Sequence, residues 1–326
     1  MQLNLPIAER LAGCQRILIA GMGGGFDIYC GLPLAFALEE QGMQVHLANL
    51  SFSPLHLLET AERPHPALAG VTADTAPFAS AGAAPASAGY FPEHYLARWF
   101  RERRGREVTV WAFERTGVRP LAEAYRRLVE RLGIDALLLV DGGVDSLARG
   151  DEAEPGTYIE DAVSLAAAAE LAELPTRLLA CVGLGAEQDL THAHIFENMA
   201  ALAADGAFLG SCSLTSAMEC YQAYEDATLY AQAIPGQDPS VINSSIISAA
   251  QGRYGNYHMT SKTSGSTLWI SPLMPICWFF DLPGVVARNP MLAHAAGTST
   301  FREAMRALSI AREAVVPRRL RRIPLQ

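Results

Sequence analysis

A run of glycines directly after an apolar stretch is the part of this sequence best suited to hold a ligand. The apolar residues 17–20 lead into the segment Gly21-Met22-Gly23-Gly24-Gly25-Phe26-Asp27, and a helix-like segment follows over residues 28–41. Glycines let the backbone turn with positive φ and bring bare N–H groups against a ligand. The dipole of the following helix also favours an anion at this point. We therefore expect Gly23, Gly24 and Gly25 to cradle a phosphate or carboxylate, with Asp27 holding a metal ion or a ligand hydroxyl.

Neither of two common nucleotide-binding patterns is complete in this segment. The dinucleotide fingerprint requires a third glycine where Phe26 stands, and an acidic residue after the next strand, which here ends Ala48-Asn49-Leu50. A P-loop requires a lysine that the segment does not contain. We therefore expect no NAD or flavin. A purely structural alternative is a tight turn in which Asp27 caps the helix.

A second candidate segment follows the apolar run 136–140. It reads Asp141-Gly142-Gly143-Val144-Asp145-Ser146-Leu147-Ala148-Arg149-Gly150-Asp151-Glu152. Carboxylates this concentrated repel one another unless a cation, an arginine or a polar ligand neutralises them, and Mg²⁺ takes carboxylate oxygens together with substrate phosphates. We expect Asp27, Asp145, Asp151 and Glu152 to supply metal ligands. The alternative is an ordinary polar loop in which Asp145 acts as a cap.

Two further segments offer acid–base and hydrogen-bonding groups. Glu187 and His192 follow the apolar run 177–182 and are candidates for a general base, while Asp145 is the third catalytic candidate. Asn243 and Ser244, at the start of a predicted helix, offer neutral hydrogen bonds to a ligand. Asp141, Gly142 and Gly143 complete the expected ligand-binding set. A histidine at a helix start is also commonly a cap or a packed group.

Strand and helix patterns alternate along the chain. Apolar runs predict strands over residues 16–20, 43–50, 107–113, 136–140 and 177–182, and helical spacing predicts helices over residues 28–41, 120–132, 158–174, 194–204, 215–233, 240–251 and 301–315. This alternation predicts an α/β fold with a doubly wound, mostly parallel sheet in a Rossmann-like, three-layer α/β/α arrangement. We expect a single domain over residues 1–326. Residues 72–89 are rich in alanine, serine, proline and glycine, which indicates a flexible loop or flap over the site that continues through residue 93, or a solvated insertion.

Composition excludes several classes of protein. The 326 residues are 50% hydrophobic and carry a formal net charge of −9, so we expect a small-molecule ligand and no nucleic-acid partner. The six cysteines form no C-x-x-C pair, which is typical of reduced core thiols. We see no signal peptide and no membrane-spanning run, so we expect a soluble, cytoplasmic protein. The apolar segment 268–280 fits either a core or the interface of a homo-oligomer.

Taken in order, several of these segments resemble the domain-of-unknown-function family 1152. The resemblance rests on Gly23-Gly24-Gly25-Phe26-Asp27, on Asp141-Gly142-Gly143-Val144-Asp145-Ser146-Leu147 with Gly150-Asp151-Glu152, on Val241-Ile242-Asn243-Ser244-Ser245-Ile246, and on Leu268-Trp269-Ile270-Ser271-Pro272-Leu273 with Trp278-Phe279-Phe280-Asp281. It spans nearly the whole chain and implies a Rossmann-like α/β fold. It implies no activity and no catalytic residues.

Three functional hypotheses follow from the residues. The first is a metal-assisted enzyme that binds a phosphorylated small molecule or nucleotide at the glycine loop and performs phosphoryl transfer or hydrolysis with Mg²⁺. The second is a metal-independent isomerase, lyase or cyclase that acts on a carboxylated metabolite. The third is a non-catalytic ligand sensor or assembly subunit.

Overall fold

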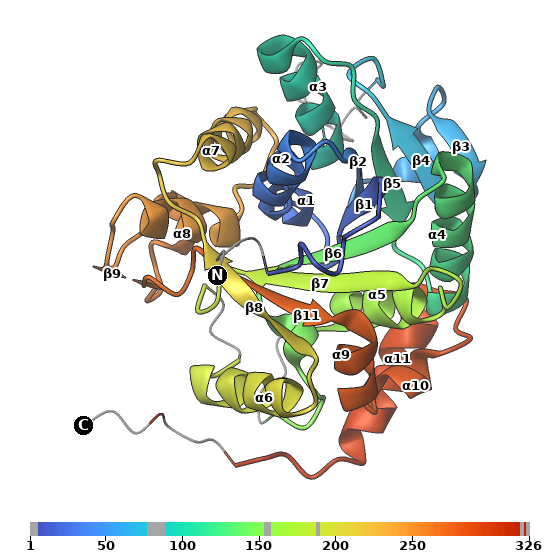
Figure 1. The fold of residues 1–326 in the computed structure, drawn as a ribbon, viewed down its shortest axis with the longest axis vertical. Coiled ribbons are helices and arrows are strands. Elements are labelled where there is room, and N and C mark those ends of the chain that lie inside the picture. Colours follow the sequence, from blue (N-terminus) through green and yellow to red (C-terminus); the bar gives the residue numbers. More distant parts are fainter. Residues whose placement is uncertain (1–5, 77–88, 153–157, 187–189, 320–322, 324–326) are drawn as a thin grey trace.

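The computed structural model describes residues 6–76, 89–152, 158–186, 190–319 and 323. A nine-stranded sheet runs through the molecule, and a separate two-stranded sheet lies beside it (Figure 1). The strands of the large sheet are β1 (Arg16–Gly21), β2 (Gln44–Ser51), β3 (Glu62–His65), β4 (Leu68–Val71), β5 (Val110–Glu114), β6 (Ala136–Gly142), β7 (Thr176–Val182), β8 (Phe208–Ser213) and β11 (Ile276–Asp281). The small sheet pairs β9 (Gly255–Asn256) with β10 (Trp269–Ile270).

The large sheet is mixed, with a parallel centre and antiparallel strands toward both edges. Its order is β3-β4-β5-β2-β1-β6-β7-β11-β8, and the five strands from β5 to β7 in this order are parallel. The hairpin β3–β4 adds antiparallel strands beyond β5, and β11 runs antiparallel between β7 and β8. The predicted α/β class is confirmed, and the predicted strands all lie in the parallel centre of the sheet.

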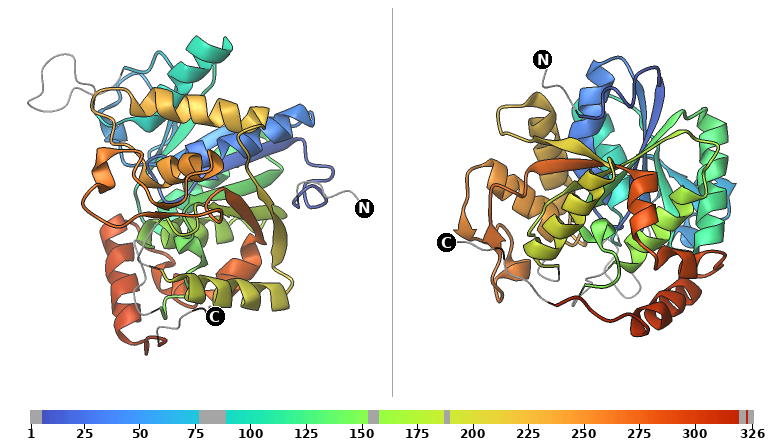
Figure 2. Two further views of the ribbon diagram at one scale, coloured as in Figure 1. Left: turned by 90° about the vertical axis from the view of Figure 1, so that its left-hand side faces the viewer. Right: turned by 60° about the horizontal axis from the view of Figure 1, so that its bottom comes forward.

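Helices cover both faces of this sheet (Figures 1 and 2). One face carries α1 (Asp27–Cys30), α2 (Leu32–Glu40), α3 (Pro92–Arg104), α7 (Glu219–Gln232) and α8 (Val241–Ala250). The other face carries α4 (Val118–Leu132), α5 (Ile159–Ala169), α6 (His192–Ala204), α9 (Leu282–Arg288), α10 (Leu292–Ala295) and α11 (Phe301–Glu313). Short 3₁₀ turns are η1 (Leu55–Leu57), η2 (Asp145–Leu147) and η3 (Ser261–Thr263).

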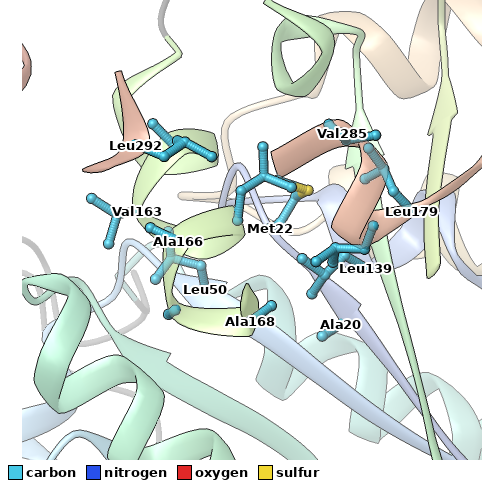
Figure 3. Packing of buried hydrophobic residues seen from close by; sticks show 14 of the residues in the cluster. Ala20, Met22, Leu50, Leu139, Val163, Ala166, Ala168, Leu179, Val285 and Leu292 are labelled. Carbon is cyan, nitrogen blue, oxygen red and sulfur yellow. The ribbon is translucent and has the colours of Figure 1, made fainter. Parts of the chain in front are cut away.

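The core follows from the two-residue period of the strands. Ile17 and Ile19 of β1 contribute to the cluster under α1 and α2, whereas Leu18 and Ala20 contribute to the cluster under α4 and α5. Every residue of β6 is buried, as expected for a strand covered on both sides. Figure 3 shows the second cluster, in which Leu139 and Leu179 of the sheet pack with side chains of α5, α9 and α10.

Two local predictions need correction. The helix predicted over residues 28–41 is interrupted at Gly31, which separates α1 from α2. A Cβ at this position would lie 2.8 Å from Cγ2 of Ile19, so the helix approaches the sheet closely there. The antiparallel strands over 62–65, 68–71, 208–213 and 276–281 were not predicted, and the last of them places the end of the apolar segment 268–280 in a strand inside the large sheet.

The predicted flap falls largely outside the described residues, because residues 77–88 are not among them. Its described residues 72–76 follow β4, and residues 89–93 lead through Tyr90 into the start of α3. Among the described helices, none combines the length and apolar character that a membrane crossing requires.

Candidate functional site

A cavity of about 910 Å³ opens at the carboxyl ends of β1 and β6, beside the starts of α1 and α5. Strands β2 and β5 extend from β1 to one side, and β7 extends from β6 to the other, so the strand order reverses at this point. Ligands of open α/β sheets bind at such reversals. The described residues that line the cavity are Gly23, Gly24, Gly25, Phe26, Asp27, Phe52, Tyr90, Arg115, Asp141, Gly142, Asp145, Glu160, Asp161, Gly236, Asp238, Pro239, Ser240, Val241, Ile242 and Lys262.

The glycine loop between β1 and α1 has the backbone that its sequence predicts. Gly24 and Gly25 have φ values of 98° and 60°, which favour glycine over any other residue. A Cβ on Gly24 would lie 2.4 Å from the ring of Phe52, and one on Gly25 would lie 2.8 Å from the hydroxyl of Tyr90. Glycine is therefore required here both by the backbone angles and by the side chains that press on the loop.

Asp27 sits beneath this loop and accepts a hydrogen bond from it. The amide of Gly23 donates to Oδ2 of Asp27 at 2.6 Å, and a Cβ on Gly142 would lie 2.7 Å from Oδ1 of the same carboxyl. Burial raises the pKa of Asp27 well above its ordinary value, and the charge of Asp141 raises it further. The amide of Gly23 thus donates to the carboxylate of Asp27 rather than to a ligand. An anion bound in the cavity must therefore also be held by other groups.

Asp141, at the end of β6, is held by the turn that follows it. The amide and hydroxyl of Ser146 donate to its Oδ2 at 3.0 and 2.5 Å. Burial, and then the charge of Asp145, raise the pKa of Asp141 to about 7. Asp145, in η2, is itself only 4% exposed and lines the cavity. The structure therefore brings Asp27, Asp141 and Asp145 together, as the sequence predicts.

A fourth buried carboxylate comes from α5 and was not predicted. Asp161 is 5% exposed, and one carboxylate oxygen from each of Asp27, Asp141 and Asp161 lies within 4.8 Å of the other two. The sequence did predict a helix over residues 158–174, but Asp161 stands apart from every glycine-rich segment. The acidic pair Glu160-Asp161 in the first turn of a helix that follows the second candidate loop is the signal that could have found it.

The wall of the cavity carries cationic and aromatic groups. Arg115 lies over the ring of Phe52, with its guanidinium carbon 5.5 Å from the ring centre, and its Nη1 is 3.5 Å from a carboxylate oxygen of Glu160. Lys262 pairs with Asp238 on the side formed by residues 236–242. Phe52 is 46% exposed, so part of its surface is open to a ligand. These groups give the cavity an acidic floor and a wall with positive charge and an aromatic ring.

Asn243 supports the glycine loop from outside the cavity. Its Nδ2 donates to the carbonyl of Phe26 at 3.3 Å, and its Oδ1 accepts from the hydroxyl of Tyr224 at 2.9 Å. The neighbouring Ser244 faces Gln232, with 3.4 Å between the two side-chain oxygens. Gly143 forms an isolated antiparallel β-bridge with Val182 at the end of β7. These three predicted ligand-binding residues therefore lie around the site rather than on its surface.

Asp151 and Glu152 lie in a different cluster, organised by Arg318 near the end of the chain. The guanidinium of Arg318 donates to Asp151 at 2.8 Å and to Glu152 at 2.7 Å. Glu152 is fully buried and also accepts from the amide of Arg149 and from Nδ2 of Asn198. These two predicted metal ligands do not join Asp27 and Asp145, because an arginine already neutralises them.

Neither of the two remaining predicted bases is among the residues described as lining the cavity. Glu187 lies outside the described residues. His192 is the exposed first residue of α6, and its ring lies near Gly185 rather than among the residues described as lining the cavity. Asp145 is therefore the member of the predicted catalytic set that the structure places in the cavity.

A buried amide–carboxyl pair behind the loop was also not predicted. Nδ2 of Asn49 donates to the carbonyl of Gly25 at 2.8 Å and to Oε1 of Glu93 at 2.7 Å. Glu93 is fully buried in the first turn of α3, and burial raises its pKa to about 7 even though the bond from Asn49 lowers it. Asn49 stands where a dinucleotide-binding fold would have its ribose-binding acid. In this protein Asn49 instead supports the glycine loop through its hydrogen bond to the carbonyl of Gly25.

The fold and the cavity define an α/β protein with buried carboxylates beneath a glycine loop. Residues 18–314 match the family described as "Protein of unknown function (DUF1152)", and the chain belongs to that family. The resemblance found in the sequence is thus confirmed. Comparison with the curated proteins and with the solved structures found no similar chain.

Proposed function

We propose that the protein is an enzyme that binds Mg²⁺ at Asp27, Asp141 and Asp161 and acts on a phosphorylated small molecule or nucleotide. The observation that carries the proposal is the convergence of three buried carboxylates, each with an oxygen within 4.8 Å of the other two, in a cavity at the carboxyl edge of the sheet. Burial raises the pKa of both Asp27 and Asp141, and repulsion from a neighbouring carboxylate raises each further, so a cation there would relieve that repulsion. Mg²⁺ is preferred because it combines carboxylate ligands with substrate phosphates and waters.

The charges of the cavity support a cationic cofactor. Its described lining contains six acidic side chains (Asp27, Asp141, Asp145, Glu160, Asp161 and Asp238) and two basic ones (Arg115 and Lys262), and each basic group already faces a carboxylate. A phosphate would be repelled from this floor unless a metal ion lay between them. With the metal present, the phosphate would lie toward the glycine loop, and Arg115 and Lys262 would hold its outer oxygens.

The aromatic wall favours a nucleotide among phosphorylated ligands. The part-exposed ring of Phe52 stands next to Arg115 and presses on Gly24 of the loop. A base could pack on this ring while the phosphates reach the metal. Asp145 is then the residue we assign to accept the proton of the attacking water or hydroxyl.

A Rossmann-like, doubly wound arrangement is part of this proposal. The strand order β5-β2-β1-β6-β7 reverses between β1 and β6, and both the glycine loop and Asp141 follow those two strands. Such a reversal is the general ligand position of doubly wound folds, which supports a ligand site here independently of the metal.

The test is metal binding by the full chain, measured by isothermal titration with Mn²⁺ and Mg²⁺. We expect Asp161→Asn to weaken binding at least tenfold. The matched control is Glu160→Gln, which removes an adjacent carboxyl of the same helix that also lines the cavity, and it should leave affinity within about twofold. Equal affinity of wild type and Asp161→Asn would refute the metal site. ADP and inorganic phosphate are then added with and without Mg²⁺, and a rise in melting temperature that requires the metal supports phosphoryl chemistry.

A metal-independent isomerase, lyase or cyclase is the second candidate. The observation that favours it is the raised pKa of Asp141, about 7, beside Asp145, because such a pair can hold one proton near neutral pH and act as acid and base. Stabilisation by a carboxylated metabolite that is indifferent to Mg²⁺ would select this candidate. Binding without turnover of any bound compound would select the sensor hypothesis.

A further inference from the structure

We propose that Cys212 and Cys277 are a redox-active dithiol, which peroxide converts into a disulfide across two strands at the edge of the sheet. Strands β8 and β11 are neighbours in the sheet (Figure 1), and the register places Cys212 of β8 directly opposite Cys277 of β11. Directly opposed residues of antiparallel strands have Cα atoms about 4.5 to 5.5 Å apart, and their side chains point to the same face. Disulfides span Cα separations of about 4.4 to 6.8 Å, so the backbone need not move.

The two sulfurs already interact. A hydrogen bond joins the two thiols and lowers the pKa of Cys212, whereas the same bond, together with burial, raises the pKa of Cys277. Thiolate character and exposure decide which cysteine reacts first. Cys212 is half-buried, whereas Cys277 is 1% exposed. Cys212 is therefore the attacking thiol, and Cys277 is the resolving thiol.

A cavity gives an oxidant access to Cys212. It has a volume of about 450 Å³ and lies between α2, the end of β8 and the start of α7, with Cys212, Leu214 and Cys220 in its lining. It is separate from the acidic cavity, because the two share none of the residues described as lining them. The dithiol is thus a second site, and it does not depend on the proposed metal or substrate.

The chemistry balances with hydrogen peroxide as the oxidant. The Cys212 thiolate attacks one peroxide oxygen and the O–O bond breaks, which leaves a sulfenic acid on Cys212 and releases hydroxide. The Cys277 sulfur then attacks the Cys212 sulfur, the S–OH bond breaks, and the hydroxyl leaves as water with the proton of Cys277. Two thiols have then become one disulfide, and the peroxide has been reduced to two waters.

The disulfide would close a long segment of chain that forms one wall of the acidic cavity. Helices α7 and α8 and the sheet β9–β10 all lie between the two cysteines, and Ser240 and Lys262 line that cavity from this segment. A crosslink that closes a long loop restricts the unfolded chain and so stabilises the fold. Oxidised protein should therefore melt at a higher temperature than reduced protein, and dithiothreitol should reverse the change.

The test is disulfide mapping of the full chain after reduction, desalting and treatment with hydrogen peroxide. Trypsin combined with a glutamate-specific protease places Cys212 in peptide 198–219, Cys220 in peptide 220–225 and Cys277 in peptide 263–288. We expect the thiol count to fall by two and peptide 198–219 to be linked to peptide 263–288. Linkage of Cys212 to peptide 220–225, a disulfide between two molecules, or six unreacted thiols would each overturn the proposal.

Variants separate the roles of the two thiols. Cys220→Ser is the matched control, since it removes the other cysteine of the same cavity, and it should form the 212–277 link at the wild-type rate. Cys277→Ser should stop the reaction at the sulfenic acid of Cys212, which dimedone labels. Dimedone labelling of another cysteine instead would show that Cys212 is not the attacking thiol. Wild-type peptide mapping decides the proposal even if the buried Cys277→Ser change prevents folding.

Discussion

Replacing Glu93 by glutamine should make the protein more stable at alkaline pH and change its stability little at acid pH. Glu93 is fully buried in the first turn of α3, and Oε1 accepts a hydrogen bond from Asn49 at 2.7 Å. Glutamine keeps the shape of the side chain and an oxygen that can accept from Asn49. It removes the charge that the folded protein must bury once Glu93 ionises.

The magnitude follows from the pKa of Glu93 in the folded and unfolded states. Burial raises that pKa to about 7 from 4.5, and each unit corresponds to about 1.4 kcal/mol. Because the folded pKa is the higher one, the stabilising contribution is complete below pH 4.5 and is lost as the pH rises through 7. Between pH 5 and pH 8 the wild type should lose about 2.5 kcal/mol that Glu93→Gln does not lose.

The assay is urea unfolding at pH 5 and pH 8, followed by the fluorescence of the four tryptophans. The quantity compared is the difference in unfolding free energy between variant and wild type, so other titrating groups common to both chains cancel. The matched control is Glu102→Gln, on the same helix but exposed. Hydrogen bonds from Tyr230 and Arg98 lower the pKa of Glu102. The difference in unfolding free energy between Glu102→Gln and the wild type should therefore change little from pH 5 to pH 8, or change with the opposite sign.

The reasoning would be refuted if the difference in unfolding free energy between Glu93→Gln and the wild type stayed constant within about 0.5 kcal/mol from pH 5 to pH 8. Glu93 would then titrate in the folded protein as it does in the unfolded chain, and its burial would have to be offset by groups other than Asn49. The same change in Glu102→Gln would show that the effect comes from the charge of α3 as a whole.

Two further substitutions test the loop and the tail. Gly24→Ala should destabilise the fold by about 1 kcal/mol more than Gly42→Ala. Both glycines have positive φ, but only at Gly24 would the new Cβ lie 2.4 Å from a ring, that of Phe52. Equal losses of unfolding free energy in urea would show that Phe52 moves aside freely. Arg318→Ala should cost about 3 kcal/mol, because it leaves the fully buried Glu152 without its cation, and a loss below about 1 kcal/mol by the same assay would contradict that role.

The centre of the fold was predictable because local pattern and buried position agree there. The run 136–140 is apolar throughout and becomes β6, which is buried along its whole length. The edge strands were missed because their residues lack such a pattern. Strand β3 is half solvent-facing, and β8 reads Phe208-Leu209-Gly210-Ser211-Cys212-Ser213, with small polar residues where an apolar run would be expected. Their pairing depends on neighbours distant in sequence, which no local window contains.

The site was predictable only where its residues follow a strand directly. Asp27, Asp141 and Asp145 lie within a few residues of β1 or β6, and the rule for the carboxyl edge of a sheet brings them together. Asp161 and Glu93 come from first turns of helices, and only the packing of those helices shows where they point. Asp151 and Glu152 were grouped with the site because they are near Asp145 in sequence. Their partner Arg318 is far along the chain, so no local pattern could show it.

The two proposals place different chemistry at two places in one sheet: the acidic cavity lies where the strand order reverses between β1 and β6, and the dithiol lies between β11 and β8 at one edge. Asp27 begins α1, and Cys30 ends the same helix, so the charges of Asp27 and Asp141 raise the pKa of Cys30 after the larger effect of burial. That thiol donates to Asn243, which in turn holds the carbonyl of Phe26 in the glycine loop. Burial and the neighbouring carboxylates together keep the Cys30 thiol protonated and unreactive. Cys212, distant from those carboxylates at the edge of the sheet, is free of this effect, and for that reason oxidation should fall on the edge dithiol and leave the floor of the cavity intact.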